Sequence, residues 1–197
     1  MDAWTTPTLS GRLVTLEPLE HRHHEGLVDA ASDGELWNLW YTLVPRPEEM
    51  AGEIAARLER RDRGEMMPFT AVDATGRVLG MTSFANIDRE LPRVEIGYTW
   101  NRRSAHGTGT NAESKLLLLT HAFETLDCPA VEFRTHWMNH QSRQAIERLG
   151  AKLDGVLRAH RRTADGSLRD TCVYSIIASE WPQVRAQLRH RLAWSGA

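Results

Sequence analysis

The chain has 197 residues and a mass of 22.3 kDa, a size that fits one domain with a substantial buried core. It is 41% hydrophobic and 25% charged, which excludes the disordered, collagen-like and disulfide-rich classes of protein. Twenty-four basic and 26 acidic residues give a formal net charge of −2, so no overall positive field attracts nucleic acid or an anionic membrane. We therefore expect neither as a partner.

The sequence carries no pattern that is typical of secretion, membrane insertion or metal binding. Its two cysteines, Cys128 and Cys172, form neither a C-x-x-C pair nor a metal-like spacing. No basic stretch followed by an apolar run opens the sequence. His21, His23 and His24 lie close together, but no carboxylate or cysteine completes a recognisable ligand spacing. We expect a cytoplasmic protein without a bound metal.

The first third of the chain predicts one strand followed by helices. Alternating apolar residues predict a strand at residues 12–17, and polar helical turns follow at 23–31 and 35–39. Residues 47–63 predict a longer helix, because a proline and two glutamates suit its first turn and Gly64 ends it.

The middle of the chain predicts a hairpin and a third strand. Residues 69–72 and 78–84 flank the turn sequence D-A-T-G, which is typical of a β-hairpin. Residues 94–100 then alternate in polarity, so two faces are expected. Glu95, Gly97 and Thr99 would share the polar face. The opposite face would be made by Val94, Ile96, Tyr98 and Trp100.

The last part of the chain predicts helices and strands in alternation. Apolar residues at spacings of three and four predict a helix at about residues 110–126. The elements expected after it are a strand at 131–137, a short helix at 142–149, a hairpin of residues 153–160 and 169–177, and a terminal helix from Glu180.

A glycine-containing turn joins the strand at 94–100 to the helix at 110–126. Backbone N–H groups in such a turn, together with a helix N-terminus, can bind phosphate. The turn matches neither a Walker loop nor a Rossmann fingerprint. A nucleotide-binding module built on it would lack the lysine and acidic partners of Mg-nucleotide chemistry. From spacing alone, a plain structural turn and an anion site both stay open. The turn reads Arg102-Arg103-Ser104-Ala105-His106-Gly107-Thr108-Gly109-Thr110-Asn111.

The order of elements, this turn, and Asn139-His140-Gln141-Ser142 through Leu149-Gly150-Ala151 together resemble the GNAT (GCN-related N-acetyltransferase) superfamily. The resemblance is closest to the RimJ/RimL-type branch and covers nearly the whole chain. It implies a mixed α/β (α+β) fold, with a mostly antiparallel twisted sheet of about seven strands, a splayed parallel pair and helices on both faces. It also implies a single domain over residues 1–197 and acetyl-CoA or coenzyme A as co-substrate.

The resemblance assigns the glycine turn to the pyrophosphate of acyl-CoA. The family loop reads Q/R-x-x-G-x-G/A, and this chain keeps both glycines but has Ser104 at the first position. Arg102 and Arg103 lie close enough in sequence to supply positive charge instead. The implied cofactor-binding residues are Tyr98, Trp100, Arg102, Arg103, Ser104, His106, Gly107, Thr108, Gly109, Asn111, Asn139 and Ser142.

The resemblance also implies two catalytic residues. Glu95 lies on the strand that lines the acyl thioester in the family, where a carboxylate can take a proton from an amine directly or through water. Ser142 matches a position that can protonate the departing sulfur, whereas many relatives use a tyrosine near the place of Ile146. The plain alternatives are a surface carboxylate for Glu95 and helix capping by Asn139 and Ser142.

The implied activity is transfer of an acetyl group from acetyl-CoA to a primary amine by direct attack in a ternary complex. The acceptor would be a protein N-terminus or other peptide, an amino acid or a small-molecule amine. A non-catalytic acyl-CoA-binding sensor is the alternative function. A homodimer through a strand edge or the terminal helix stays open.

Two further clusters bear on the acceptor. Aromatic residues in the early helical region either shape one wall of an acceptor cleft or pack in the core. Basic residues beside the last hairpin either meet an acidic substrate or form a solvated turn. These two clusters are Trp37, Trp40 and Tyr41, and Arg158, Arg161 and Arg162.

Overall fold

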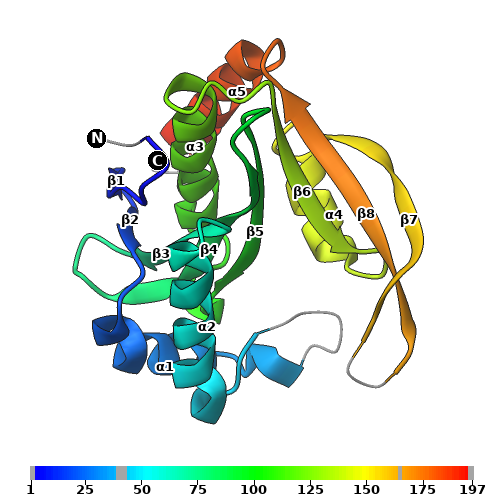
Figure 1. Ribbon diagram of the computed structural model, residues 1–197. Coiled ribbons are helices and arrows are strands. Elements are labelled where there is room, and N and C mark those ends of the chain that lie inside the picture. The colour runs from blue at the N-terminus through cyan, green and yellow to red at the C-terminus, as the bar shows by residue number, and fades with distance from the viewer. Residues whose placement is uncertain (1–2, 39–43, 164–165, 195–197) are drawn as a thin grey trace.

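The computed structural model describes residues 3–38, 44–163 and 166–194, and one eight-stranded sheet runs through it (Figure 1). The spatial order of the strands is β1-β2-β3-β4-β5-β6-β8-β7, and every neighbouring pair is antiparallel except β5 and β6. The strands are β1 (Leu9–Ser10), β2 (Thr15–Pro18), β3 (Met66–Val72), β4 (Val78–Asp88), β5 (Arg93–Asn101), β6 (Ala130–His136), β7 (Lys152–Arg162) and β8 (Leu168–Ile177). The expected mostly antiparallel mixed sheet is confirmed, with the two-residue β1 added to the seven strands expected.

Helices pack against both faces of this sheet, as expected. The α-helices are α1 (His24–Ser32), α2 (Met50–Asp62), α3 (Thr110–Glu124), α4 (His140–Glu147) and α5 (Trp181–Trp194). Short 3-10 helices occur at η1 (His21–His23), η2 (Leu36–Asn38), η3 (Pro47–Glu49) and η4 (Arg103–Ala105). Among the described residues, no helix has the length and apolar character needed to cross a membrane.

Two buried clusters define the layers. The larger one joins apolar residues of the sheet to α3, α4 and α5, for example through Leu118, Ile146 and Leu188. The second joins α1 and α2 to the other face, through Leu27 and Ile54 among others. Burial of such side chains is the main stabilising term of a fold of this size. The clusters also show which face of the sheet a given strand residue occupies.

The strands β5 and β6 form the one parallel pair in the sheet, and they stay together only briefly. Their register covers Arg93 with Ala130, Val94 with Val131 and Glu95 with Glu132. Beyond this point the two strands diverge, as Figure 1 shows. The expected splayed parallel pair is therefore confirmed, and the β5 edge after Glu95 is not paired with β6.

A β-bulge in β5 corrects the predicted faces of this strand. Tyr98 has a positive φ of 53°, and β5 uses one residue more than β4 over this stretch. The extra residue reverses the side to which later side chains point. Thr99 therefore faces α3 together with Val94 and Ile96, whereas Trp100 packs in the cluster of α1 and α2. The prediction that Tyr98 and Trp100 share a face with Val94 and Ile96 was wrong.

Candidate active site

A cavity of about 360 Å³ lies where β5 and β6 diverge. Its walls come mainly from β5, β6, the N-terminal half of α3, α4, and the hairpin of β7 and β8. The expected site residues that line it are Glu95, Tyr98, Trp100, His106, Asn111, Asn139 and Ser142. Those in the adjoining loop, outside the cavity wall, are Arg102, Arg103, Ser104, Gly107, Thr108 and Gly109.

The cavity receives side chains from both faces of the sheet. Glu95 and Arg134 alternate with Val94 and Phe133, whose side chains lie in the cluster beneath α3. Because neighbouring strand residues point to opposite faces, Glu95 and Arg134 point to the face of α1 and α2. Ser142 belongs to α4, which packs on the α3 side. The two expected catalytic residues therefore approach the opening from opposite faces.

Glu95 is held in a nearly closed environment. Its side chain is only 8% exposed, and its Oε2 accepts a 2.6 Å hydrogen bond from Asn86 Nδ2. Arg134 Nε lies 3.6 Å from the same oxygen. Burial raises the pKa of Glu95 above the ordinary glutamate range, while Arg134 and Asn86 act in the opposite direction. A carboxylate in this position holds a proton more tightly than a surface glutamate does, which suits a general base.

Gly97 makes room for that carboxylate. A Cβ at position 97 would lie 2.7 Å from Glu95 Oε1. Any side chain at this position would therefore push the carboxylate away from its present place. Sequence reasoning placed Gly97 on the same face as Glu95 but assigned it no role, because the clash depends on the rotamer of Glu95.

Asn139 caps α4 and positions Ser142. Asn139 Oδ1 accepts a 2.9 Å hydrogen bond from the backbone N–H of Ser142. Asn139 is therefore a helix cap, which was the plain alternative to a role in cofactor binding. Ser142 contributes only its backbone N–H to the cap, so its hydroxyl is available to the cavity that it lines.

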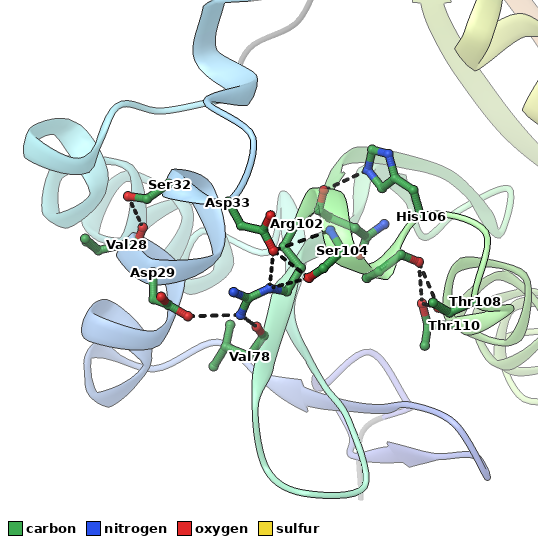
Figure 2. A network of polar contacts seen from close by, with 12 residues as sticks. Val28, Asp29, Ser32, Asp33, Val78, Arg102, Ser104, His106, Thr108 and Thr110 are labelled. Atoms are coloured by element: carbon green, nitrogen blue, oxygen red, sulfur yellow. Dashed lines mark hydrogen bonds and ion pairs between the residues drawn. The ribbon is translucent and has the colours of Figure 1, made fainter.

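Arg102 is engaged in a network of polar contacts with other residues of the protein (Figure 2). Its side chain is buried, its Nε donates to Asp33 at 2.8 Å, and its Nη1 donates to Asp29 at 3.0 Å and to the Val78 carbonyl at 3.1 Å. The hydroxyl of Ser104 also donates to Asp33. Hydrogen bonds from Ser104 and Arg102 lower the pKa of Asp33 to about 2. These contacts connect the glycine turn to the C-terminal end of α1. They engage the Arg102 guanidinium within the protein and so weaken the prediction that Arg102 contacts a phosphate.

The rest of the turn leads directly to the N-terminus of α3. Gly107 and Gly109 both have positive φ, at 81° and 89°, a conformation that favours glycine. Gly109 is the N-cap of α3, and the cavity extends to His106 and Asn111 at this end. The first turn of a helix carries unpaired N–H groups and partial positive charge. This end of the cavity therefore suits an anionic group.

Lys115 is a cavity residue that sequence reasoning missed. Its Nζ donates to Thr99 Oγ1 at 3.1 Å and approaches Thr82 Oγ1 at 3.5 Å. Burial lowers the pKa of Lys115 to about 7. A signal was present in the sequence, because Lys115 lies three residues after Ala112 and four before Leu119 on the predicted buried face of the helix.

The early aromatic cluster is only partly described. Trp37 packs against the buried cluster of α1 and α2, as expected if these aromatic residues pack in the core and do not shape an acceptor cleft. Trp40 and Tyr41 lie outside the described residues. Within residues 3–38, 44–163 and 166–194, no three His, Cys, Asp or Glu side chains are grouped so that they could hold a metal ion.

Comparisons with known proteins agree with this arrangement. The chain is 32% identical to the Bacillus subtilis (strain 168) protein named "Putative ribosomal N-acetyltransferase YdaF", over 54% of this chain and 57% of that protein. The match thus spans less than two thirds of that relative. A GCN5-related N-acetyltransferase from Brucella melitensis has a TM-score of 0.81 at 27% identity, over 95% of this chain and 86% of that chain.

Mycobacterium smegmatis RimJ in complex with CoA-disulfide has the same fold, with a TM-score of 0.79 at 21% identity over 95% of this chain and 96% of that chain. The chain therefore shares its fold with a RimJ protein. The family described as acetyltransferase (GNAT) domain matches residues 13–152. The chain therefore belongs to the acetyltransferase (GNAT) domain family.

Proposed function

We propose that this protein is an N-acetyltransferase that transfers an acetyl group from acetyl-CoA to a primary amine. The observation that carries the proposal is the buried carboxylate of Glu95, set beside the unpaired β5 edge in a cavity between β5 and β6. Membership of the GNAT family supports acetyl transfer as the reaction. The name of the Bacillus subtilis relative, a ribosomal N-acetyltransferase, supports amines of ribosomal proteins as one class of acceptor.

The cavity has the chemistry that acetyl-CoA requires, with acetyl-CoA supplying the acetyl thioester. At one end, backbone N–H groups near Gly107, Gly109 and the start of α3 suit the phosphates. Arg103 adds an exposed positive charge beside them. At the other side, Asn139 and the hydroxyl of Ser142 suit the pantetheine arm and sulfur.

The two faces of the cavity divide the proton transfers. Glu95 accepts the proton that the attacking amine loses as its nitrogen bonds to the acetyl carbon. Backbone N–H groups of β5 beyond Glu95 donate hydrogen bonds to the carbonyl oxygen as it gains negative charge. Ser142 gives its hydroxyl proton to the sulfur as the carbon–sulfur bond breaks, and takes a proton back from solvent water, to which Glu95 releases the proton that it accepted. Glu95 and Ser142 lie on opposite faces of the sheet, so the two proton transfers take place on different sides of the reacting carbon.

The amine chemistry indicates how much help Glu95 must give. A free α-amino group has a pKa of roughly 8, so about a tenth of it is neutral and nucleophilic at pH 7. A lysine amine, with a pKa of about 10.4, is neutral in less than about one part in a thousand at pH 7. A single carboxylate base is therefore best matched to an α-amine or another weakly basic amine.

The proposal is tested by calorimetry with acetyl-CoA, CoA and ATP, followed by thiol release with pooled small amines and N-terminal peptides. We expect acetyl-CoA and CoA to bind, ATP not to compete, and thiol release to require an acceptor. Glu95→Gln should lower kcat roughly 100-fold or more and remove the acid limb of the pH–rate profile, because a carboxamide cannot take the proton. Its affinity for CoA should be unchanged.

Other outcomes separate the alternatives. CoA binding without thiol release across the panel would favour the acyl-CoA sensor over the enzyme. An unchanged pH–rate profile in Glu95→Gln would remove the base assignment. Ser142→Ala should lower turnover more than acetyl-CoA affinity, and wild-type turnover in that variant would leave Ser142 with its backbone contact to Asn139 alone.

A further inference from the structure

The end of the cavity around Glu95 is lined by arginines. Arg134 lies on β6, Arg161 on β7 and Arg169 on β8, and all three line the cavity. Arg161 and Arg169 are paired across the two strands of the hairpin. Along β8, Arg169 and Thr171 alternate with the residues whose side chains lie in the larger buried cluster. Arg169 therefore points to the opposite face of the sheet, which is the face of Glu95.

The carboxylates at this end are already engaged by other side chains. Glu132 forms an ion pair with Arg93 Nη2 at 2.6 Å and accepts a hydrogen bond from Arg134 Nη2 at 2.9 Å. Glu95 accepts from Asn86 and lies 3.6 Å from Arg134. Arg93 and Arg134 therefore balance the two glutamates, and the charges of the other two arginines are left over.

Arg161 and Arg169 have no ion pair with any described residue. The Nε of Arg169 is buried and has no hydrogen-bond acceptor among the described residues. A buried N–H donor without an acceptor destabilises a protein, and each such group calls for a physical explanation. Arg169 is half-buried, and burial first and the nearby Arg161 second lower its pKa, while the charge of Glu95 acts in the opposite direction.

The same hairpin shows what an arginine does when it has only a structural role. Arg158 is 81% exposed, and its Nε pairs with the carboxylate of Asp170. The outward arginine is thus paired within the hairpin. The arginines that face the cavity are not, although pairing would have stabilised them. A ligand that brings an anion into the cavity would supply the missing partner.

We propose that the acceptor carries a carboxylate close to its amine, and that Arg169 and Arg161 bind this carboxylate while the amine faces Glu95. This inference rests on the proposed function and specifies its substrate class. A guanidinium holds a carboxylate through two parallel hydrogen bonds, so it orients the acceptor as well as attracting it. The nearby positive charges also favour the neutral form of the amine, which is the form that attacks.

Two kinds of acceptor offer this chemistry, and matched pairs distinguish them. The first pair is a free amino acid and its carboxamide. The second is a peptide with Asp at its second position and the same peptide with Asn there. Each member is titrated into the CoA-saturated protein by calorimetry and is also assayed for acetyl transfer with acetyl-CoA.

We expect the carboxylate member of one pair to bind and react roughly 10- to 100-fold better than its neutral partner, the range for a hydrogen bond to a charged group. Arg169→Gln should remove most of this preference by weakening only the carboxylate member. Arg161→Gln should reduce it less, because Arg161 is exposed and more screened by solvent. Arg158→Gln is the matched control from the same hairpin and should keep the full preference.

Failure of this inference and failure of the proposed function give different results. Acetyl transfer without preference in either pair, or a preference that Arg169→Gln leaves intact, would overturn the carboxylate site and leave the enzyme standing. Preferential binding that Arg169→Gln abolishes, with no transfer to any amine, would support the site and overturn the enzyme. Absence of preference in both binding and transfer would overturn the inference directly.

Discussion

A single carboxylate and the glycine two residues after it carry most of the chemistry assigned to this cavity. Burial raises the pKa of Glu95, and the hydrogen bond from Asn86 fixes where its oxygens lie. The space for those oxygens exists because position 97 has no Cβ. A proton acceptor must lie within hydrogen-bond reach of the amine, so its place matters as much as its pKa.

Gly97→Ala tests this arrangement. The new Cβ would sit 2.7 Å from Glu95 Oε1 and displace the end of a flexible side chain, whereas the backbone at this position needs no positive φ. We expect kcat to fall by about 100-fold, the scale of a 1 Å misplacement, with the free energy of unfolding within about 1 kcal/mol of wild type. Thiol-release kinetics and urea unfolding measure both.

Gly155→Ala is the matched control for that substitution. Gly155 is also a strand glycine, and a Cβ there would meet nothing within 4 Å. It should leave kcat unchanged. Full activity in Gly97→Ala would show that the observed position of Glu95 is not required for catalysis.

At the scale of one element, α3 places an ionisable side chain against the sheet. Its apolar periodicity was readable from the sequence, and its buried face includes Leu118 and Leu119. Lys115 falls on that face and is 6% exposed, with two threonine hydroxyls as its hydrogen-bond partners. Those hydroxyls also bond to each other at 2.8 Å, so they do not depend on the lysine. The helix therefore tolerates an ionisable group that costs it stability.

Lys115→Met should expose that cost through the pH dependence of stability. Burial lowers the pKa of Lys115 to about 7 from 10.5, so between these values the unfolded chain binds more protons than the folded one. The free energy of unfolding of the wild type should therefore rise with pH across this window. The methionine variant should be more stable near pH 6, and its advantage should shrink toward about pH 9.

Urea unfolding at several pH values measures this difference. Lys152→Met is the control, because Lys152 is 76% exposed and pairs with Glu180 at the surface. Its difference from wild type should vary much less with pH. Parallel stability curves for Lys115→Met and wild type would show that Lys115 stays protonated in the folded protein.

At the scale of the whole molecule, the sequence predicted those features that depend on neighbours along the chain. Hairpin turns, the period of α3 and the cap of α4 are local, and the structure has them. The partners of Arg102 are far from it in sequence, so the burial of its charge was not predicted. The bulge at Tyr98 depends on register with β4, and the unpaired state of Arg169 depends on three strands meeting. The resemblance to a family supplied the site, and long-range packing decided which of its residues reach the cavity.

The brief pairing of β5 with β6 leads to a last prediction, which concerns how a ligand joins the two parts of the sheet. Only Arg93–Glu95 of β5 is registered with β6, so backbone groups after Glu95 on that edge have no strand partner there. A ligand in the cavity would cover them. We expect saturating CoA to slow amide hydrogen exchange most at residues 96–98 and 133–135, and less at the already paired start of β5.

Ligand binding also raises overall stability, so local and global protection must be separated. At 100 times its Kd a ligand stabilises the folded state by about 2.7 kcal/mol, which slows exchange of all amides that require global unfolding. Amides that exchange through local opening report contact with the ligand instead. Residues 73–76, in the turn between β3 and β4, are outside the cavity wall and should exchange at the same rate with and without CoA. Glu95→Gln should keep the protection, because Glu95 is assigned to the amine and not to CoA. Protection that is equal at residues 73–76 and 96–98 would place the ligand elsewhere on the protein.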